Sequence, residues 1–426
     1  MEKKIIQLLE VPFYQETLDN GLTVYLLPDE RVNNFYANFV TRFGSKDLEF
    51  TPKDSKKSVQ VPPGIAHFLE HKAFEQESGI EPFDFFSQHG ASANAGTYTD
   101  RTAYEFYSAE DLEENLNFLL DFVQSPYFTE ENIQKEKGII EQEINMNIDD
   151  PAWVLNETLR ANVFQKDFLR YPIAGKVSDI MGITKKQLED CYKTFYHPSN
   201  MFLVMTGHFN PEKVIDIIRK NQAKKKFGKP FEIKRKTIKE PEEVKEKLTK
   251  VCLATEIPKF NYGIKLKRSR LDFVSAREQY YYFNMILELL LGMTSDFYEQ
   301  ATKDGLLAFP IECGVATTDD YYLLEMTGET ENPKEVVTRM KAVLQSISIT
   351  EEEVERMKRS FLSKYVYRFD NIVSLNRAMM GAIVRYHDIL TDEVDLIRNL
   401  NMDDLQKIIA QFDLKNESLV LVHPNR

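Results

Sequence analysis

Cysteine is scarce in this sequence, and no arrangement of cysteines suggests a bound metal or a disulfide framework. The 426 residues include 3 cysteines. These residues, Cys191, Cys252 and Cys313, are widely spaced and form no C-x-x-C pair. Spacing of this kind argues for free thiols in a reducing compartment, and each is expected to be a small buried apolar residue.

Long apolar runs and an excess of positive charge are also missing. No window reaches the ~18 apolar residues of a membrane helix. A short apolar run near the N-terminus stops at Glu10, and no small-residue cleavage site follows it. The net charge of −13 and the pI of about 5.3 argue against nucleic acid or an anionic membrane as a partner. We therefore expect a soluble, cytoplasmic protein.

The chain contains enough apolar residues to build more than one core. Hydrophobic residues make up 42% of it and aromatic residues 12%, so folded structure is expected throughout. A chain of this length normally divides into two or more domains.

Two stretches about half the chain apart share a pattern. Gln124-Ser125-x-x-x-Thr129-Glu130-Glu131 recurs 221 residues later, beginning at Gln345. A second pair, Leu188 to Phe195 and Leu405 to Phe412, has nearly the same offset and precedes a strand-like run in each case. Two agreeing offsets favour an internal duplication of about 215 residues over chance similarity between amphipathic segments.

A lysine- and glutamate-rich stretch separates the two halves and is interpreted as an exposed linker. The predicted boundaries are 1–222 for the first domain, 223–250 for the linker and 251–426 for the second domain.

Within the first half, strand and helix patterns alternate irregularly. Asn20-Gly21 between apolar runs predicts a hairpin, Phe35 to Phe43 predicts a strand, and Thr97 to Tyr107 predicts another. Helices are predicted for 111–124 and 130–148. This order favours an α+β fold in which each domain is a mostly antiparallel sheet covered by helices.

The strongest chemical signal is the pentad His67-Phe68-Leu69-Glu70-His71. On a helix, His67 and His71 lie on one face and can bind one zinc ion, with Glu70 at the edge of that face. Zinc held in this way lowers the pKa of a bound water toward ~7, and a nearby carboxylate can accept the proton. The alternative is two surface histidines beside a solvated glutamate. Adding the repeat offset leads to Glu288-Leu289-Leu290-Leu291-Gly292, which lacks this ligand pattern, so the chemistry is expected in the first half alone.

Two glutamates downstream are candidates for the third ligand. Glu136 and Glu143 lie seven residues apart and project from one face of a predicted helix. One can bind the metal while the other supports a histidine or the water. Their repeat counterparts are Met357 and Lys364, so the acidic face occurs only in the half with the histidines. An ordinary solvated charged face is the alternative.

Together these residues resemble the inverted zincins of the pitrilysin–insulinase family. Further matching segments are Gly64-Ile65-Ala66, Gly90 to Ala95 with Thr97, and Phe195 to Met201. The resemblance covers the first half throughout, and the second half mainly through the duplication.

The resemblance implies a role for each site residue. His67, His71 and Glu143 would bind zinc, Glu70 would be the general base, and Glu136 would be a supporting carboxylate. The strand near Asn94, Ala95 and Thr97 would pair with an extended peptide substrate. The chain would form half of a clamshell.

One part of the family pattern is missing. Active members supply an Arg and a Tyr seven residues apart from the second half, but the matching segment here, Gln300 to Phe309, contains neither. We therefore expect the zinc-bearing subunit of a heterodimer, whose sibling chain supplies that pair, or else a homodimer.

The leading interpretation is a zinc endopeptidase that cleaves peptides or short unfolded segments. The alternative is a non-catalytic scaffold or assembly subunit of a peptidase-like complex. A dedicated maturation protease for one peptide would have the same sequence features as a general peptidase.

Overall fold

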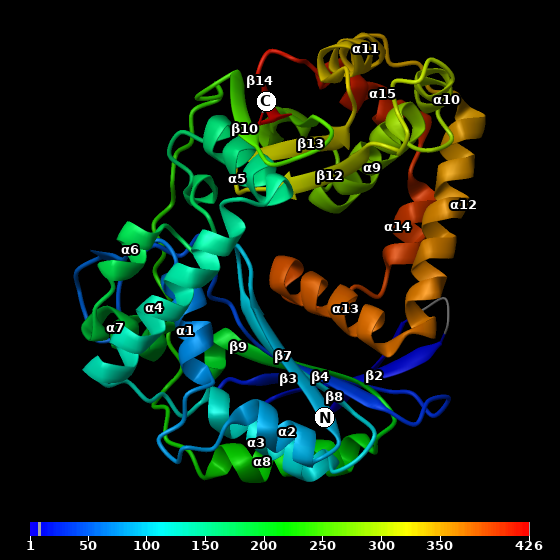
Figure 1. Ribbon diagram of the computed structural model, residues 1–426. Helices are drawn as coiled ribbons and strands as arrows, with labels where there is room; N and C mark the ends of the chain where they lie inside the picture. The colour runs from blue at the N-terminus through cyan, green and yellow to red at the C-terminus, as the bar shows by residue number, and fades with distance from the viewer. Residues whose placement is uncertain (7–9, 426) are drawn as a thin grey trace. The chain divides into compact units, whose positions relative to one another are not determined.

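The protein forms two compact units, and neither unit is one continuous run of chain. The computed structural model describes residues 1–6 and 10–425, so the end of the N-terminal apolar run lies outside the described residues. Unit 1 comprises Met1–Ile144, Pro172–Thr237 and Tyr365–Glu393. Unit 2 comprises Asn145–Tyr171, Ile238–Lys364 and Val394–Arg426. The chain thus crosses between the units several times (Figure 1).

Unit 1 is built on a seven-stranded sheet with the order β1-β2-β3-β9-β4-β8-β7. Its neighbouring strands are antiparallel except for the parallel pair β3 and β9. The strands are β1 (Glu2–Ile6), β2 (Val11–Thr17), β3 (Thr23–Pro28), β4 (Phe35–Thr41), β7 (Ala91–Thr97), β8 (Thr102–Ser108) and β9 (Met201–Gly207), with β5 (Glu49–Phe50) and β6 (Val59–Gln60) forming a separate pair.

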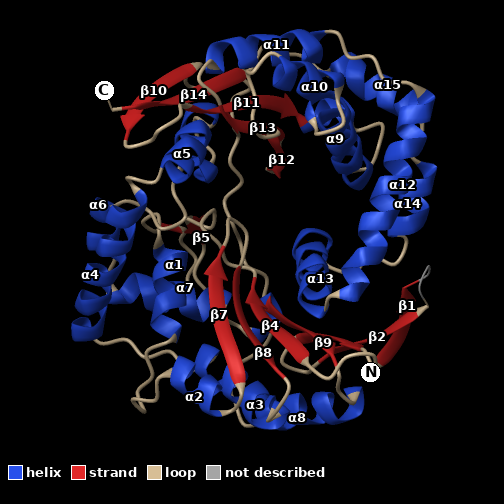
Figure 2. Ribbon diagram, turned by 45° about the vertical axis from the view of Figure 1, so that its right-hand side comes forward, coloured by secondary structure: helices blue, strands red, loops and turns tan. Residues whose placement is uncertain are grey.

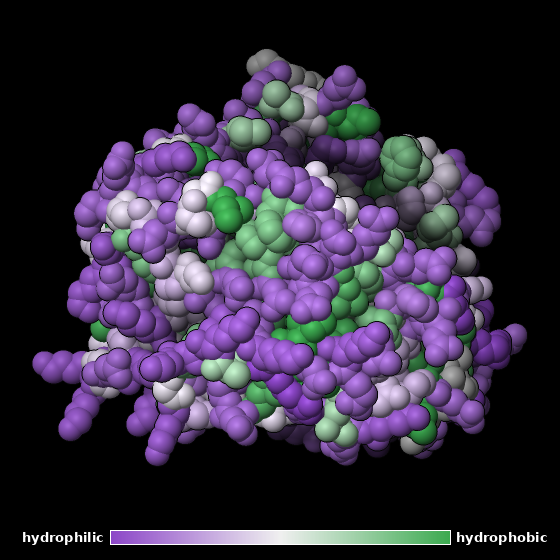
Figure 3. Space-filling model, turned by 90° about the horizontal axis from the view of Figure 1, so that it is seen from below, coloured by the Kyte–Doolittle hydropathy of each residue, from purple (hydrophilic) through white to green (hydrophobic). Residues whose placement is uncertain are grey.

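Helices cover both faces of the unit 1 sheet. They are α1 (Ile65–Ala73), α2 (Pro82–Gln88), α3 (Leu112–Val123), α4 (Glu130–Asn147), α6 (Val177–Met181), α7 (Lys185–Phe195), α8 (Pro211–Ala223) and α13 (Ile372–Tyr386), with short 3₁₀ turns η2 (Pro198–Asn200) and η4 (Arg368–Asp370). α13 lies on one face, and α2, α3 and α8 lie on the other (Figure 2). Seen from below, the surface is largely hydrophilic with apolar side chains between polar ones (Figure 3), as expected for amphipathic helices that bury one face.

Unit 2 repeats this architecture on a five-stranded sheet with the order β10-β14-β11-β13-β12. The strands are β10 (Leu248–Leu253), β11 (Lys259–Lys267), β12 (Glu312–Thr317), β13 (Tyr321–Glu329) and β14 (Glu417–Pro424). The helices are α5 (Pro151–Val163), α9 (Ala276–Leu291), α10 (Asp296–Lys303), α11 (Pro333–Gln345), α12 (Glu351–Tyr367), α14 (Glu393–Asn399) and α15 (Met402–Gln411), with 3₁₀ turns η1 (Phe168–Arg170) and η3 (Arg268–Leu271). The α+β class is confirmed.

The two units share the order of their elements, which supports the duplication read from the sequence. Helices α3 and α11 begin at Leu112 and Pro333, and α4 and α12 begin at Glu130 and Glu351, so both pairs have the 221-residue offset. Each sheet also contains one parallel pair, β3 with β9 and β10 with β14.

Each half of the sequence contributes one helix to the sheet of the other half. In unit 1, Asn376 of α13 accepts a 3.0 Å hydrogen bond from Asn38 of β4. In unit 2, Asn156 of α5 accepts one of 2.9 Å from Asn261 of β11. Because a buried amide without a partner is costly, these pairs fix where each helix lies on its sheet.

Two local expectations need correction. The stretch Thr97 to Tyr107 is not a single strand, because β7 and β8 are joined by a turn over residues 98–101. The prediction that all three cysteines are buried was wrong, because Cys191 is buried but Cys252 and Cys313 are exposed.

The sequence showed no apolar run long enough for a membrane helix, and the structure agrees with this. No helix among residues 1–6 and 10–425 is long and apolar enough to cross a membrane.

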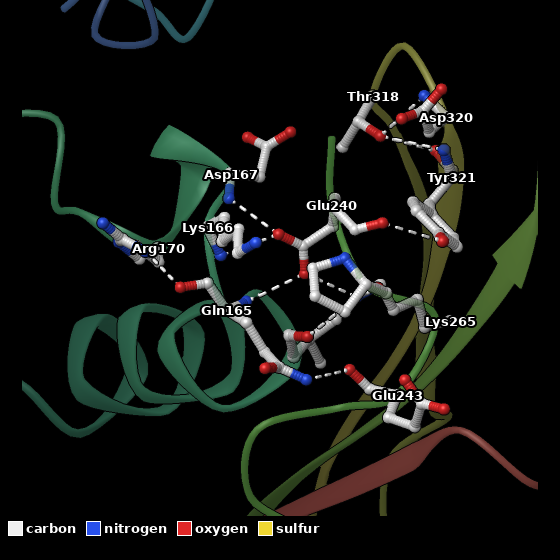
Figure 4. Close-up of polar contacts among 12 residues, drawn as sticks. Gln165, Lys166, Asp167, Arg170, Glu240, Glu243, Lys265, Thr318, Asp320 and Tyr321 are labelled. Carbon is white, nitrogen blue, oxygen red and sulfur yellow. Dashed lines mark hydrogen bonds and ion pairs between the residues drawn. The ribbon is translucent and has the colours of Figure 1, made fainter. Parts of the chain in front are cut away.

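The predicted exposed linker contains one buried anchor, Glu240, which is 5% exposed. Its carboxylate accepts hydrogen bonds from the backbone N–H groups of Gln165, Lys166 and Asp167 and forms a 2.7 Å ion pair with Lys265 (Figure 4). A charge-rich composition predicts solvation on average but cannot show which carboxylate will find buried partners.

Candidate metal centre

Helix α1 places the pentad, and Gly64 determines where this helix starts. Gly64 has φ +88°, and a Cβ at this position would lie 2.4 Å from the carbonyl oxygen of Ala174. Only glycine fits this backbone approach. Ile65, Ala66, Phe68 and Leu69 are buried, so the histidines and Glu70 are left on the partly exposed side.

Helix α4 brings the distal glutamates to the histidines. Glu143 lies 3.6 Å from His67 Nε2 through Oε1 and 3.4 Å from His71 Nε2 through Oε2. His71 Nδ1 lies 2.9 Å from Oε1 of Glu136. The sequence placed these four side chains at one site, and the structure does bring them together.

The three nearest groups have the spacing of a metal site. Among the described residues, His67, His71 and Glu143 form the one His/Cys/Asp/Glu group that could hold an ion, with ligand atoms within 4.8 Å of one another. Ligand atoms ~2.1 Å from a tetrahedral zinc ion lie ~3.4 Å apart, which matches the contacts of Glu143 with both imidazoles. Two imidazoles and one carboxylate are also a known ligand set of catalytic zinc.

The surroundings of His67 and His71 shift the pKa values of the two imidazoles in opposite directions. Burial lowers the pKa of His71, but Glu136 and Glu143 outweigh that effect and raise this pKa to about 10. Burial and the charge of His71 lower the pKa of His67 to about 4. The contact with His71 lowers the pKa of Glu143. At neutral pH and without a metal, His71 is therefore protonated, while His67 is neutral with its lone pair available.

Glu136 occupies the position of a supporting carboxylate. It is 7% exposed and contacts Nδ1 of His71, the ring nitrogen that does not face Glu143. Such a contact fixes the tautomer and orientation of a metal-binding imidazole. Nδ1 of His67 is also buried, and it has no hydrogen-bond partner among the described residues.

Glu70 is held by Thr97, an interaction that the sequence interpretation missed. Thr97 Oγ1 at the end of β7 donates a 2.8 Å hydrogen bond to Oε2 of Glu70. Burial raises the pKa of Glu70. The sequence interpretation assigned Thr97 to substrate binding through its strand, and the structure adds a contact of its hydroxyl with the candidate base. No spacing rule could reveal this contact, because it joins a helix to a strand 27 residues away.

Strand β7 lies at the edge of its sheet, which suits the pairing with a peptide that the family resemblance implied for this segment. Within the described residues it pairs with β8 alone. The N–H of Ala95 donates to Oδ1 of Asn94 at 2.9 Å instead of to a neighbouring strand. A bound extended peptide could therefore take over this N–H.

Unit 2 lacks the corresponding ligands. Met357, the counterpart of Glu136, is 3% exposed and belongs to an apolar core. The segment expected to carry an Arg/Tyr pair lies around the end of α10 and the turn at Gly305, and it contains neither residue.

Comparisons with known proteins agree with this fold and identify its family. The insulinase (peptidase family M16) profile matches residues 59–177, and the profile of the peptidase M16 inactive domain matches residues 182–361. The uncharacterized zinc protease YmfH of Bacillus subtilis is 37% identical over 411 residues, which cover 95% of this chain and 94% of YmfH.

Solved structures show the same fold over nearly the whole chain. An M16-like peptidase from Alicyclobacillus acidocaldarius has a TM-score of 0.91 and 31% identity, covering 99% of this chain and 100% of that one. A protease from Helicobacter pylori has a TM-score of 0.82 at 19% identity, covering 97% and 100%, and this likeness concerns the fold alone. The chain belongs to the insulinase family of peptidases, M16.

Proposed function

We propose that this chain is a zinc-dependent endopeptidase that hydrolyses peptides or short unfolded segments. The observation that supports this most directly is the convergence of His67, His71 and Glu143 at metal-ligand spacing, beside a glutamate that does not belong to the ligand group. Two relatives bear the name uncharacterized zinc protease, which supports the same reaction class.

In this proposal each residue has a distinct task. His67 and His71 would hold zinc through Nε2, and Glu143 would hold it through its carboxylate. Glu136, at Nδ1 of His71, would keep that imidazole in the tautomer with a free lone pair on Nε2. When bound, zinc supplies Lewis acidity that polarises the scissile carbonyl and lowers the pKa of the attacking water.

Glu70 moves the proton. Its carboxylate accepts a proton from the attacking water and returns it to the amine that leaves, so that one C–N bond breaks and one C–O bond forms. Thr97 holds Glu70 in one orientation by occupying Oε2. The backbone of Asn94 and Ala95 on β7 pairs with the peptide and positions the carbonyl.

The missing Arg/Tyr pair leads to a proposal about the partner. We propose that this chain is the zinc-bearing subunit of a heterodimer, and that a sibling chain of the same family supplies groups that stabilise the oxyanion. Loss of one such donor typically costs ~10²–10³ in kcat. The chain alone should therefore hydrolyse peptides slowly, and the mixture with its sibling should be faster by about that factor.

The test measures zinc content and peptide hydrolysis for the full chain, with and without the sibling, in wild type and Glu70→Gln. Zinc retained with hydrolysis abolished would support Glu70 as the base. Glu77→Gln, at an exposed position in the loop after α1, is the matched control and should keep both properties. Unchanged hydrolysis in Glu70→Gln would refute the assignment. A scaffold subunit would show no zinc-dependent hydrolysis in any mixture.

A further inference from the structure

A pocket of about 520 Å³ lies beside β7 and is lined by residues of unit 1. Its position on the sheet follows from the strand register. Asn38 contacts α13, Glu105 lies directly opposite Asn38, and Asn94 lies directly opposite Glu105. Directly opposed residues share a face of a sheet. The side chains of Asn94 and Ser92 therefore lie on the α13 face, whereas Thr97 faces Glu70 on the other side.

The wall of this pocket carries a fixed polar network. Glu105 accepts hydrogen bonds from Tyr36 and, at 3.0 Å, from Arg377 of α13. The pocket lining contains two further hydrogen-bond acceptors, Asn34 and Asp370. Oδ1 of Asn34 is buried and has no hydrogen-bond partner among the described residues, and Asp370, just before α13, is exposed.

The charges that line the pocket favour a cation. The lining contains two carboxylates, Glu105 and Asp370, and one guanidinium, that of Arg377. Arg377 forms an ion pair with Glu105. Arg31 also acts on Asp370, but Arg31 is itself paired with Asp29 at 2.9 Å. An acidic occupant would be repelled by the carboxylate of Asp370, whereas an ammonium or guanidinium group would be attracted to it and could donate a hydrogen bond to Oδ1 of Asn34.

The distance along β7 between Thr97, which contacts Glu70, and the pocket determines which residue of a bound peptide reaches the pocket. Asn94 and Ser92 precede Thr97 by three and five residues, or ~10 Å and ~17 Å along a strand. A peptide residue paired opposite Asn94 or Ser92 would point its side chain to the same face. The residue between them would point away.

We propose that this pocket is a substrate subsite for a positively charged side chain, lysine or arginine, three or five residues from the scissile bond. The proposal rests on the proposed function, because it assumes that the peptide pairs with β7. It adds a specificity determinant outside the metal centre, formed by Asp370, Asn34 and Glu105.

The test measures peptide binding, so that it does not depend on cleavage. The zinc-loaded full chain with Glu70→Gln is titrated with fluorescent peptides of one parent sequence, in which a single position three, four or five residues on either side of the intended scissile bond is Lys, Gln or Glu. Lys should bind about five- to tenfold more tightly than Glu at spacings of three or five on one side. The spacing of four should show little preference.

Substitutions then locate the preference. Asp370→Lys should reverse the ratio of Lys to Glu affinities, and the milder Asp370→Asn should bring it close to one. Asp54→Lys, the same charge change at an exposed loop position outside the pocket, should keep the wild-type ratio. Because the readout is a ratio within each variant, a general loss of affinity does not affect it.

The outcomes separate this proposal from the peptidase function. No dependence on peptide charge, or a preference that Asp370→Lys leaves unchanged, would overturn the subsite. Absence of zinc-dependent hydrolysis by the chain and its sibling would instead refute the proposed function, and the binding ratios would still show whether the pocket selects a cation.

Discussion

Glu136→Gln should weaken zinc binding without removing a metal ligand. Glu136 is 7% exposed and lies 2.9 Å from Nδ1 of His71, and glutamine keeps its size and one acceptor oxygen while removing the charge. Loss of such a supporting carboxylate typically costs 10–100-fold in metal affinity, or about 1.4–2.8 kcal/mol. Glu143, His67 and His71 remain in place, so binding should be weakened but not lost.

The carboxylate of Glu136 also stabilises the proton on His71, which zinc must displace when it binds. The contacts with Glu136 and Glu143 raise the pKa of His71 to about 10, so removing the charge of Glu136 lowers this pKa and reduces competition by protons. The loss of zinc affinity should therefore be larger at pH 9 than at pH 7.

Competition with a chromophoric chelator at both pH values measures this effect in the full chain. Glu141→Gln, on the same helix but off the face of Glu136 and Glu143, is the control and should bind zinc as the wild type does. If Glu136→Gln bound zinc as tightly as this control at both pH values, the supporting role of Glu136 would be refuted.

Three further predictions follow from the same structure. Zinc binding should release about one proton between pH 6 and 8, because His71 has a pKa of about 10 and is protonated there while His67, with a pKa of about 4, is not. Apparent zinc affinity should then rise about tenfold per pH unit, and calorimetry in buffers of different ionisation enthalpy should detect the proton; release of two protons would contradict the assignment. Gly64→Ala should destabilise the protein by at least ~2 kcal/mol in urea unfolding, because φ +88° and the 2.4 Å approach of Ala174 O both oppose a Cβ. Gly138→Ala, in the middle of α4 with no atom within 4 Å of the new Cβ, should instead stabilise by ~0.5–1 kcal/mol, and equal effects at the two glycines would refute the reasoning. Glu240→Ala should cost ~3–5 kcal/mol in the same assay because it leaves Lys265 buried without its partner, whereas adding Lys265→Met should recover part of the loss; no recovery would show that the backbone hydrogen bonds of Glu240 matter more than the ion pair.

The parts of the fold that the sequence predicted are those that depend on local periodicity. Helices α3 and α4 were predicted within one residue of their ends, because a threonine followed by acids, or a regular apolar stripe, is present in the segment itself. The hairpin at Asn20-Gly21 was also found, with Gly21 at φ +90°. In contrast, the turn between β7 and β8 was missed because threonine and tyrosine continue the strand-like composition across it.

The candidate site was predicted where its chemistry depends on spacing along a helix. His67 with His71 and Glu136 with Glu143 each share a helix face, so sequence distance translates directly into a shared direction. Contacts between elements gave no such signal. The bond from Thr97 to Glu70, the interaction of Glu240 with Lys265 and the pocket around Glu105 all join segments whose proximity depends on the tertiary fold.

The most direct test of the central claim is X-ray absorption spectroscopy at the zinc edge on the zinc-loaded full chain. We predict one zinc ion with two imidazole nitrogens at ~2.0–2.1 Å and carboxylate or water oxygens at ~2.0–2.2 Å. His71→Ala should lose one of the imidazole contributions, and the matched His208→Ala, away from the cluster, should keep both. Sulfur ligands at ~2.3 Å, or an unchanged spectrum in His71→Ala, would contradict a metal centre formed by His67, His71 and Glu143.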